Sequence, residues 1–172
     1  MKICICIPSR GRYNYVNRLL TSAFRNVKND KNIIVKYYIN EDDKQLDQYK
    51  IQLESFKNRY PDSVDYIIGP DQSPVYSWNL IAENTEADLY MLAGDEVVFE
   101  TTDWDILFED TKKQYPDGIF CMSIFDGRES RYEAKRCTTP VVTKEWREAL
   151  GYFWGPMFWH WEVDRWTGEL AK

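Results

Sequence analysis

The sequence predicts an α/β protein with a mostly parallel central sheet, and three observations support this. Short β-branched and aromatic segments alternate with segments whose apolar residues recur at helical spacing. Polar clusters follow the predicted strands directly. The 172 residues, 44% of them hydrophobic, suffice for one domain with a sizeable core. Because alternating strands and helices imply parallel strands with right-handed crossovers, we expect residues 1–172 to form a single domain.

The first part of the chain contains three predicted strands and two predicted helices. The strands are apolar runs over residues 2–8, 32–39 and 64–68. They end in the polar sequences SRGR and NEDD and in the pair Gly69–Pro70. The helices between them are indicated by apolar residues at helical spacing, which are Val16, Leu19, Leu20, Ala23, Phe24 and Val27, then Leu46, Tyr49, Leu53, Phe56 and Tyr60.

The third and fourth helices are predicted from their starts. Ser73 is a natural N-cap and Pro74 suits the first helical position. A strand over residues 88–92 comes next, and Thr102 or Asp103 is expected to cap the fourth helix.

The remaining segments of the sheet are predicted nearer the C-terminus. Strands are expected over residues 118–125 and 137–142, separated by a charged loop at 126–136. Thr143 is expected to cap a helix that stops at Gly151.

Ligands of parallel α/β sheets bind at the carboxyl ends of the strands. The residues directly after each predicted strand are therefore the informative ones, and we expect four groups of them to converge on one edge. These groups are Ser9, Arg10, Gly11 and Arg12; Asn40, Glu41, Asp42 and Asp43; Gly69, Pro70 and Asp71; and Asp95 with Glu96.

The charge balance and the absence of long apolar segments exclude several classes of protein. A net charge of −6 argues against binding nucleic acid through phosphate contacts, but it is compatible with a small phosphorylated ligand. No segment is long enough to span a membrane, and the N-terminal apolar stretch is too short for a signal peptide. We expect a cytoplasmic protein whose cysteines are reduced, namely Cys4, Cys6, Cys121 and Cys137.

The sequence MLAGDEVVF, residues 91–99, places two acids at the end of an apolar strand. Gly94 would let a ligand approach closely, and carboxylates suit a hard divalent cation such as Mg²⁺ or Mn²⁺. One or two protein carboxylates suffice when substrate phosphates supply further ligands. The alternative is that Asp95 and Glu96 form only a polar turn.

Two other polar clusters each have two interpretations. The loop PSRGR, residues 8–12, would present backbone amides and two guanidinium groups to an anion, or it is an ordinary turn. The cluster NEDD, residues 40–43, is either the solvated start of a helix or a set of hydrogen-bonding groups for a ribose or base.

The aromatic tail, residues 151–172, is predicted to contain a helix that begins near Trp159. In that helix Asp164 lies one turn after His160 on the same flank, and Glu162 falls on the other side of the apolar stripe. A carboxylate among aromatic rings would have a raised pKa and act as a base, unless the rings are core and the acids solvated. The stripe consists of Trp159, Val163, Trp166 and Leu170.

Taken in order, these segments resemble the family 2 type of GT-A glycosyltransferases, in the small variant often seen in viral and bacteriophage sequences. The resemblance rests on ICICIPSRGR, on GPDQSPVYSWNLIAENTEADLYMLAGDEVVF and on the late aromatic and acidic segment, and it covers residues 2 to about 168. It implies a Rossmann-like three-layer α/β/α sandwich. If the protein is viral, we expect it in the host cytoplasm. The resemblance also implies a nucleotide-diphosphate-sugar donor, with a UDP-sugar expected, and Mn²⁺ or Mg²⁺ as cofactor.

The resemblance implies donor-binding roles for several residues. The loop after the first strand matches the family's nucleoside-contacting loop, and the acids after the second strand match those that contact base or ribose. Asn79 lies where the family often has an Ala-x-Asn motif, which Ser77–Trp78–Asn79 matches in part. With Gly94, the implied nucleotide-sugar-binding residues are Pro8, Ser9, Arg10, Arg12, Glu41, Asp42, Asp43 and Asn79.

The implied metal and base residues depart from the family pattern. Asp95 matches the last aspartate of the family's Asp-x-Asp metal motif, but Ala93 replaces the first. Glu96 and His160, the sole histidine of the sequence, are the further candidate metal ligands. The family's catalytic base belongs to a late Glu-Asp motif, for which this chain offers Glu162 and Asp164, and the helical flank favours Asp164.

The sequence thus predicts a metal-dependent glycosyltransferase that transfers a sugar to a glycan or other hydroxyl acceptor, with inversion at the anomeric carbon. Two alternatives stay open. One is a catalytically inactive module of the same fold that binds a nucleotide or sugar. The other is a nucleotidyltransferase, which would need more basic residues around a triphosphate.

Overall fold

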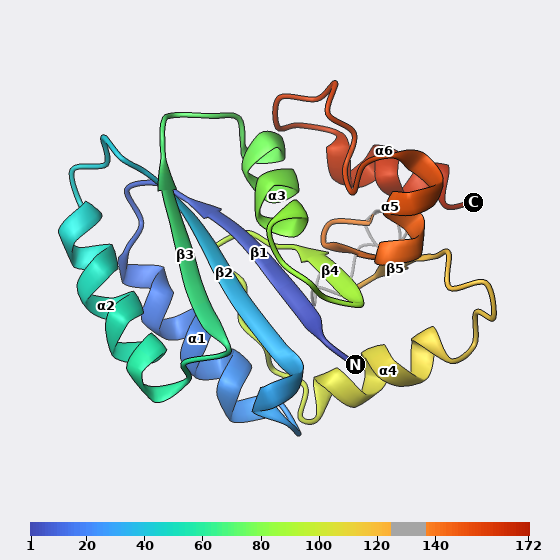
Figure 1. The fold of residues 1–172 in the computed structure, drawn as a ribbon, viewed down its shortest axis with the longest axis horizontal. Coiled ribbons are helices and arrows are strands. Elements are labelled where there is room, and N and C mark those ends of the chain that lie inside the picture. Colours follow the sequence, from blue (N-terminus) through green and yellow to red (C-terminus); the bar gives the residue numbers. More distant parts are fainter. Residues whose placement is uncertain (125–136) are drawn as a thin grey trace.

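The structure, a computed structural model, describes residues 1–124 and 137–172 and contains a six-stranded sheet. The strand order is β3-β2-β1-β4-β6-β5, and β1 to β4 are parallel (Figure 1). β6 pairs antiparallel with both neighbours, so it is the one reversed strand of this sheet. The strands are β1 (Ile3–Ser9), β2 (Ile33–Asn40), β3 (Val64–Gly69), β4 (Leu89–Leu92), β5 (Cys121–Ser123) and β6 (Pro140–Thr143).

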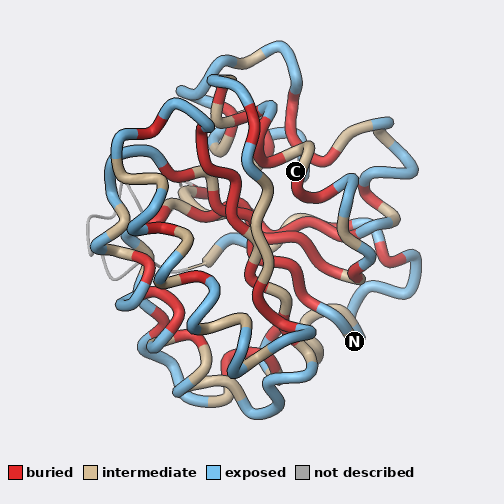
Figure 2. The backbone as a smooth tube through the Cα atoms, turned by 60° about the vertical axis from the view of Figure 1, so that its left-hand side comes forward, coloured by how far each residue is buried: buried red, intermediate tan, exposed pale blue. Residues whose placement is uncertain are grey.

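Helices cover both faces of the sheet, which gives the predicted three-layer α/β/α sandwich (Figure 1). One apolar cluster joins the sheet to α1 (Asn14–Asn26), α2 (Leu46–Arg59) and α4 (Trp104–Lys112). A second cluster joins the other face to α3 (Pro74–Glu83), α5 (Lys144–Leu150) and the region around α6 (Val163–Leu170). Figure 2 shows the buried residues concentrated along the central strands. The central parallel strands β1 and β4 are therefore buried on both faces, as their apolar sequences require, whereas the edge strand β3 is only partly buried.

Local capping chemistry fixes the helix ends as predicted at two places. The Ser73 hydroxyl accepts a hydrogen bond from the Tyr76 amide at 3.0 Å, and Thr143 does the same for the Trp146 amide at 3.0 Å. Gly151 ends α5 in the left-handed conformation, with φ of 84°. At α4, Asp103 precedes the helix but its side chain makes no capping hydrogen bond.

The C-terminal part differs from the prediction in three respects. Of residues 118–124, the described part of the strand expected over 118–125, only Cys121–Ser123 form a strand, and the strand expected over 137–142 begins only at Pro140. The charged loop at 126–136 lies outside the described residues. Residues 151–162 form turns and bends, so α6 starts at Val163 rather than near Trp159. The Gly155–Pro156 pair is a turn signal that the apolar spacing concealed.

None of the helices within the described ranges is both long and apolar enough to cross a membrane.

Candidate active site at the carboxyl edge of the sheet

The loops after the first three strands in the chain meet at one edge of the sheet. Arg10 connects them, because its Nη2 lies 2.8 Å from Asp42 Oδ2 and its Nη1 lies 2.8 Å from Asp71 Oδ1. Asn40 also donates a hydrogen bond to Asp71. The predicted convergence of the strand-end residues is therefore confirmed for these loops.

The loop after β4 joins the same cluster through Asp95. This carboxylate is only 4% exposed, although it belongs to a loop. The Ser9 hydroxyl donates a hydrogen bond to Asp95 Oδ2 at 2.6 Å, and Arg12 Nη2 lies 3.2 Å from Asp95 Oδ1. Since β1 and β4 are adjacent parallel strands, their carboxyl ends bring these residues together. Asp95 thus faces the loop that follows β1.

Tyr49, whose place in the sequence predicts only a helix core residue, completes a series of hydrogen bonds to Asp95. The Arg12 amide donates to the Tyr49 hydroxyl at 2.8 Å, and the Tyr49 hydroxyl and Ser9 Oγ are 2.6 Å apart. If Tyr49 donates to Ser9, Ser9 is free to donate to Asp95. These hydrogen bonds fix both the backbone of the loop after β1 and one oxygen of the Asp95 carboxylate. Ser9 and Tyr49 are 40 residues apart, so no local sequence pattern indicates their hydrogen bond.

Asp95 and Glu96 differ strongly in proton affinity. Burial raises the pKa of Asp95 to about 6, although the Ser9 hydrogen bond and Arg12 oppose this. Burial also acts on Glu96, but hydrogen bonds from its own backbone amide and from Asp95, together with Arg12, hold the pKa of Glu96 below its ordinary value. A proton shared by the pair therefore resides on Asp95.

Gly94 leaves room for the Glu96 carboxylate to fold back over the loop. A Cβ atom at Gly94 would lie 2.8 Å and 2.9 Å from the two carboxylate oxygens of Glu96. The absence of a side chain at Gly94 therefore sets where Glu96 points. Any direct contact between Gly94 and a ligand stays a prediction.

The predicted nucleotide-binding acids of the second loop have different surroundings. Asp43 is buried and accepts hydrogen bonds from the Gly11 amide at 2.6 Å and the Gln45 amide at 2.8 Å. Gly11 has φ of 67°, a conformation that favours glycine. Asp43 therefore shapes the first loop, whereas the Asp42 carboxylate and the exposed Glu41 lie at the surface. Their contacts with a nucleotide stay predictions, as does any contact of Pro8, which lies within β1.

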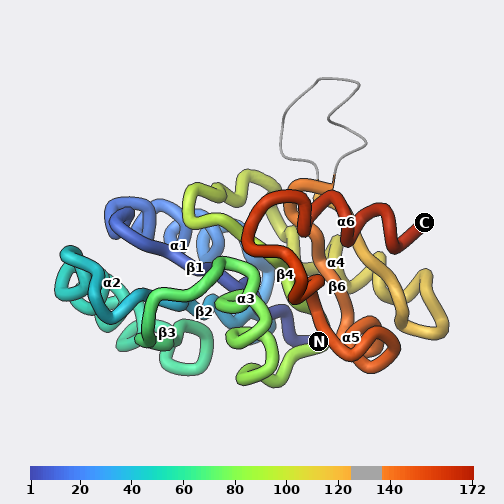
Figure 3. The backbone as a smooth tube through the Cα atoms, turned by 90° about the horizontal axis from the view of Figure 1, so that it is seen from above, coloured from blue at the N-terminus to red at the C-terminus, as the bar shows by residue number. Residues whose placement is uncertain are grey.

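Asn79 holds the tail against α3. Its Nδ2 donates to the Trp154 carbonyl at 2.9 Å and to the Val75 carbonyl at 3.0 Å, while its Oδ1 accepts from the Trp154 amide at 3.1 Å. The tail runs beside α3 as a result (Figure 3). This structural role uses both polar atoms of the Asn79 side chain, and a donor-binding role stays a prediction.

His160 and the tail acids are not placed as the predicted helix required. His160 lies against the Trp78 ring, with centroids 6.1 Å apart, and it precedes α6. It therefore shares no helical flank with Asp164, and that argument for Asp164 over Glu162 is wrong. Trp159 is 75% exposed rather than part of an apolar stripe, and Leu170 is also exposed. Val163 alone of the stripe is fully buried.

The side chains of Glu162 and Asp164 interact with Arg165 in the same segment of the chain. Glu162 adopts a left-handed conformation with φ of 71° and forms an ion pair with Arg165 at 3.3 Å. Asp164 Oδ1 accepts a hydrogen bond from the Arg165 amide at 2.8 Å. Within the described residues, no hydrogen bond or ion pair joins either acid to Asp95. Their role as bases stays a prediction.

A divalent ion would find two converging carboxylates at this edge. Arg12 Nη2 lies 3.2 Å from both Asp95 Oδ1 and Glu96 Oε2, so one positive charge already contacts both oxygens. Across residues 1–124 and 137–172, no group of three or more His, Cys, Asp or Glu side chains is arranged to hold a metal ion. The expected trio of Asp95, Glu96 and His160 is thus not assembled, because His160 belongs to the irregular tail. The residues present fit an Mg²⁺ or Mn²⁺ ion that takes its other ligands from water and phosphate.

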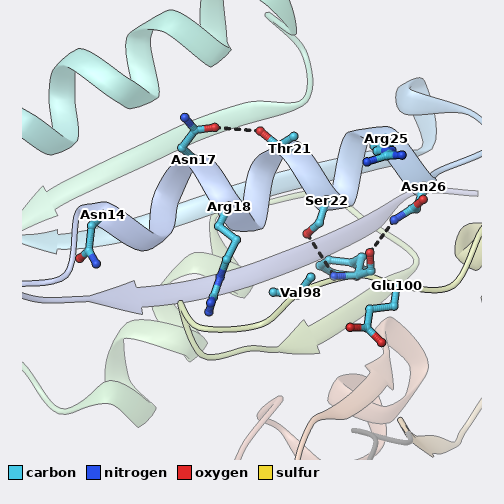
Figure 4. A pocket seen from close by; sticks show the side chains of 10 residues that line it. Asn14, Asn17, Arg18, Thr21, Ser22, Arg25, Asn26, Val98 and Glu100 are labelled. Carbon is cyan, nitrogen blue, oxygen red and sulfur yellow. Dashed lines mark hydrogen bonds between the residues drawn. The ribbon is translucent and has the colours of Figure 1, made fainter.

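A groove of about 690 Å³ lies between α1 and the loop after β4 (Figure 4). Two residues of α1 hold this loop: Ser22 accepts a hydrogen bond from the Phe99 amide at 3.1 Å, and Asn26 donates to the Phe99 carbonyl. Arg18 donates to the Glu96 carbonyl at 2.8 Å. The polar lining of the groove therefore anchors the loop that carries Asp95 and Glu96.

Comparison with known proteins shows similarity of structure without similarity of sequence. No protein-family profile and no curated protein sequence matches this chain. The mannosyltransferase PcManGT from Pyrobaculum calidifontis, solved with GDP-Man and Mn²⁺, is similar with a TM-score of 0.75 at 8% identity, over 95% of this chain and 49% of PcManGT. TarS residues 1–349 from S. aureus are similar with a TM-score of 0.66 at 11% identity, over 99% of this chain and 55% of that one.

A third similar structure has a different activity. It is CMP:2-keto-3-deoxy-manno-octonic acid synthetase in complex with CTP, with a TM-score of 0.53 at 10% identity, over 88% of this chain and 78% of the synthetase. This chain spans about half the length of the two glycosyltransferase chains above. At these identities the similarity establishes the fold alone, which is the mixed α/β, Rossmann-like fold of GT-A glycosyltransferases.

Proposed function

We propose that the protein is a metal-dependent glycosyltransferase that uses a nucleotide-diphosphate-sugar. The observation that carries the proposal is the convergence of Arg12, Asp95 and Glu96 at the carboxyl edge of the sheet. Two structures of the same fold support it, because PcManGT was solved with GDP-Man and Mn²⁺ and TarS with UDP-GlcNAc. A UDP-sugar is the donor we expect, and a glycan or another hydroxyl compound is the acceptor.

The donor would lie across the loops that follow β1, β2 and β4. Arg10 and Arg12 supply guanidinium groups, which match the geometry of phosphate oxygens. Asp42 and Glu41 stand beside them as hydrogen-bond acceptors for the ribose or base. Because the net charge of the protein is −6, this local pair of positive charges would offset the overall repulsion of an anionic diphosphate.

Asp95 and Glu96 are the residues that would hold Mn²⁺ or Mg²⁺. The ion, when bound, offsets the negative charge that develops on the leaving diphosphate. Asp95 needs its proton removed to bind a cation, and Ser9 and Arg12 favour the ionised form. Ser9 holds Oδ2 of Asp95, so Oδ1, which lies 3.2 Å from Arg12 Nη2, is the oxygen that would bind a cation.

Asp164 or Glu162 is proposed to take the proton from the acceptor hydroxyl. The hydroxyl oxygen would attack the anomeric carbon on the face opposite the diphosphate while the bond from that carbon to the diphosphate oxygen breaks, so that the nucleoside diphosphate leaves and the product has inverted configuration. A general base contributes a rate factor of roughly 10² to 10⁴. Both acids belong to the tail, which Asn79 attaches to α3, and α3 follows the loop after β3 at the carboxyl edge.

The direct test is release of UDP or GDP from nucleotide-sugars in the presence of Mn²⁺, first with water and then with hydroxyl acceptors. The proposal predicts release that stops on chelation of the metal. Binding without release from any nucleotide-sugar would instead support the inactive binding module, which Ala93 in place of an acid favours.

A nucleotidyltransferase is the second candidate because of the structural similarity to the CTP-bound synthetase. It predicts release of pyrophosphate from CTP or another triphosphate with a sugar acid or sugar phosphate as co-substrate. Pyrophosphate release without release of a nucleoside diphosphate would replace the glycosyltransferase proposal with this one.

A further inference from the structure

Arg12 occupies the position where a metal ion would be expected. Its Nη2 lies 3.2 Å from Asp95 Oδ1 and 3.2 Å from Glu96 Oε2. The second oxygen of Asp95 is already held by the Ser9 hydroxyl at 2.6 Å. Oδ1 is therefore the oxygen that both the guanidinium group and a divalent ion would use. The two cations cannot sit between the same carboxylates, because like charges repel at such a separation.

The Arg12 side chain is built to leave this position while its backbone stays fixed. The backbone amide is bound to the Tyr49 hydroxyl at 2.8 Å. The side chain is 45% exposed, and its guanidinium group lies 4.6 Å from the centre of the Tyr15 ring. A guanidinium group resting on an aromatic face can pivot there while it stays partly desolvated.

Arg10, two residues away, has a different set of partners and serves as the comparison. It lies 2.8 Å from Asp42 and 2.8 Å from Asp71, which follow β2 and β3. It has no ion pair with Asp95 or Glu96 among the described residues. The same loop therefore carries one arginine that ties strand ends together and one that contacts the carboxylate pair.

We propose that Arg12 is a resident cation that competes with the divalent ion for Asp95 and Glu96, and that a nucleoside diphosphate removes this competition by drawing Arg12 onto its phosphates. This inference rests on the proposed function. It makes metal and diphosphate binding cooperative, because each favours the arrangement in which Arg12 has left the carboxylates. The metal alone binds weakly, since it must displace the guanidinium group without compensation.

The test is Mn²⁺ binding, measured by electron paramagnetic resonance of the free ion, with and without UDP. For the wild type we expect the Mn²⁺ affinity to rise about tenfold or more when UDP is present, within the usual range of coupling between sites. For Arg12→Gln we expect Mn²⁺ alone to bind about tenfold more tightly than to the wild type. The gain that UDP gives in Arg12→Gln should be about tenfold smaller than the gain in the wild type, because only direct phosphate ligation of the ion remains.

Three control variants identify the cause. Arg10→Gln removes the same charge from the same loop and is expected to leave the affinity for Mn²⁺ alone within about threefold. Arg12→Lys keeps the charge and is expected to behave nearly as the wild type does. When Asp95→Asn is added to the Arg12→Gln variant, the gain in affinity for Mn²⁺ alone is expected to disappear. This result would show that the ion binds at Asp95 and Glu96. Circular dichroism verifies that each variant is folded.

Equal Mn²⁺ affinity of Arg12→Gln and the wild type, in the absence of UDP, overturns the inference. If Arg10→Gln gains as much affinity for Mn²⁺ alone as Arg12→Gln does, the inference is also overturned, because the gain would then reflect net charge alone. A gain in Arg12→Gln with no UDP binding by any variant gives a different result: the competition stands, whereas the diphosphate half of the inference and the proposed function both fail.

Discussion

The carboxyl edge of the sheet and the C-terminal tail carry the two halves of the proposed chemistry, and they are held in different ways. At the edge, parallel strands fix the starting points of four loops, and charged side chains such as Arg10 connect these loops. The tail has no regular structure between Gly151 and Glu162, and Asn79 attaches it to α3 through the backbone of Trp154. Strand register thus positions the candidate metal and donor residues, whereas a few side-chain contacts position the candidate base.

The largest effect is expected at the edge. Asp95→Ala removes the buried carboxylate on which Ser9 and Arg12 converge, so both Mn²⁺-dependent binding of the nucleoside diphosphate and turnover should be lost. Titration calorimetry with UDP and Mn²⁺ measures the binding, and nucleotide release measures the turnover. Retention of metal-dependent binding in Asp95→Ala would move the metal site away from this edge.

The tail acids are expected to affect turnover only. Asp164→Asn and Glu162→Gln should leave donor affinity within about threefold, while the variant that lacks the base loses roughly 10² to 10⁴ in kcat. The comparison of the two variants assigns the base to one of the two acids. If donor affinity falls in step with kcat, the tail belongs to the donor site and the division of roles is wrong.

The attachment of the tail gives the next largest effect. Asn79→Ala removes three hydrogen bonds, two of them to the backbone of Trp154, and should lower the free energy of unfolding by about 2 kcal/mol. The matched control is Asn84→Ala at the end of the same helix, where an exposed local bond to Leu80 predicts a change below about 0.5 kcal/mol. Urea denaturation measures both. Equal stability of the two variants would mean that Asn79 does not secure the tail.

The smallest expected effect is on the free energy of unfolding, which the buried Asp95 carboxylate lowers when it is ionised at high pH. Burial raises the pKa of Asp95 from 3.8 to about 6, so the folded protein retains a proton that the unfolded chain has lost between these values. The stabilising effect of that proton is present below pH 3.8 and is lost as the pH rises through about 6. Asp95→Asn should therefore be more stable than the wild type by about 1–2 kcal/mol at pH 8 and equally stable near pH 4.

The ionised Glu96 carboxylate is expected to have the opposite effect on the free energy of unfolding. Because the pKa of Glu96 is below its ordinary value, its charge favours the folded state at neutral pH, and Glu96→Gln should be less stable than the wild type there. Thermal unfolding across pH 4–8 measures both variants. A stability gain in Glu96→Gln at pH 8 would show that the shared proton is assigned to the wrong carboxylate.

The sequence predicted those features that depend on local chemistry or on the rules of parallel sheets. Ser73 and Thr143 were recognisable because capping needs only the next few residues. The meeting of Ser9, Asp42 and Asp95 at one edge followed from the carboxyl ends of parallel strands lying together.

The features that the sequence did not predict depend on contacts between distant residues. Tyr49 fits an apolar helical stripe, and nothing near it in the sequence indicates that its hydroxyl contacts Ser9. Arg12 was expected to bind the nucleoside, and its pairing with Asp95 depends on how the loops pack. In the tail, the spacing of aromatic residues imitated a helix, whereas the left-handed Glu162 delays its start to Val163.

The central claim is that Asp95 and its neighbours form a metal-dependent site for a nucleoside diphosphate. The most direct measurement is the thermal stability of the wild-type protein with UDP or GDP, in the presence of Mn²⁺ and then of a chelator. The account predicts stabilisation of about 2.7 kcal/mol at a ligand concentration 100 times Kd, lost when the metal is removed. No stabilisation by any nucleoside diphosphate, or equal stabilisation with and without Mn²⁺, would contradict it.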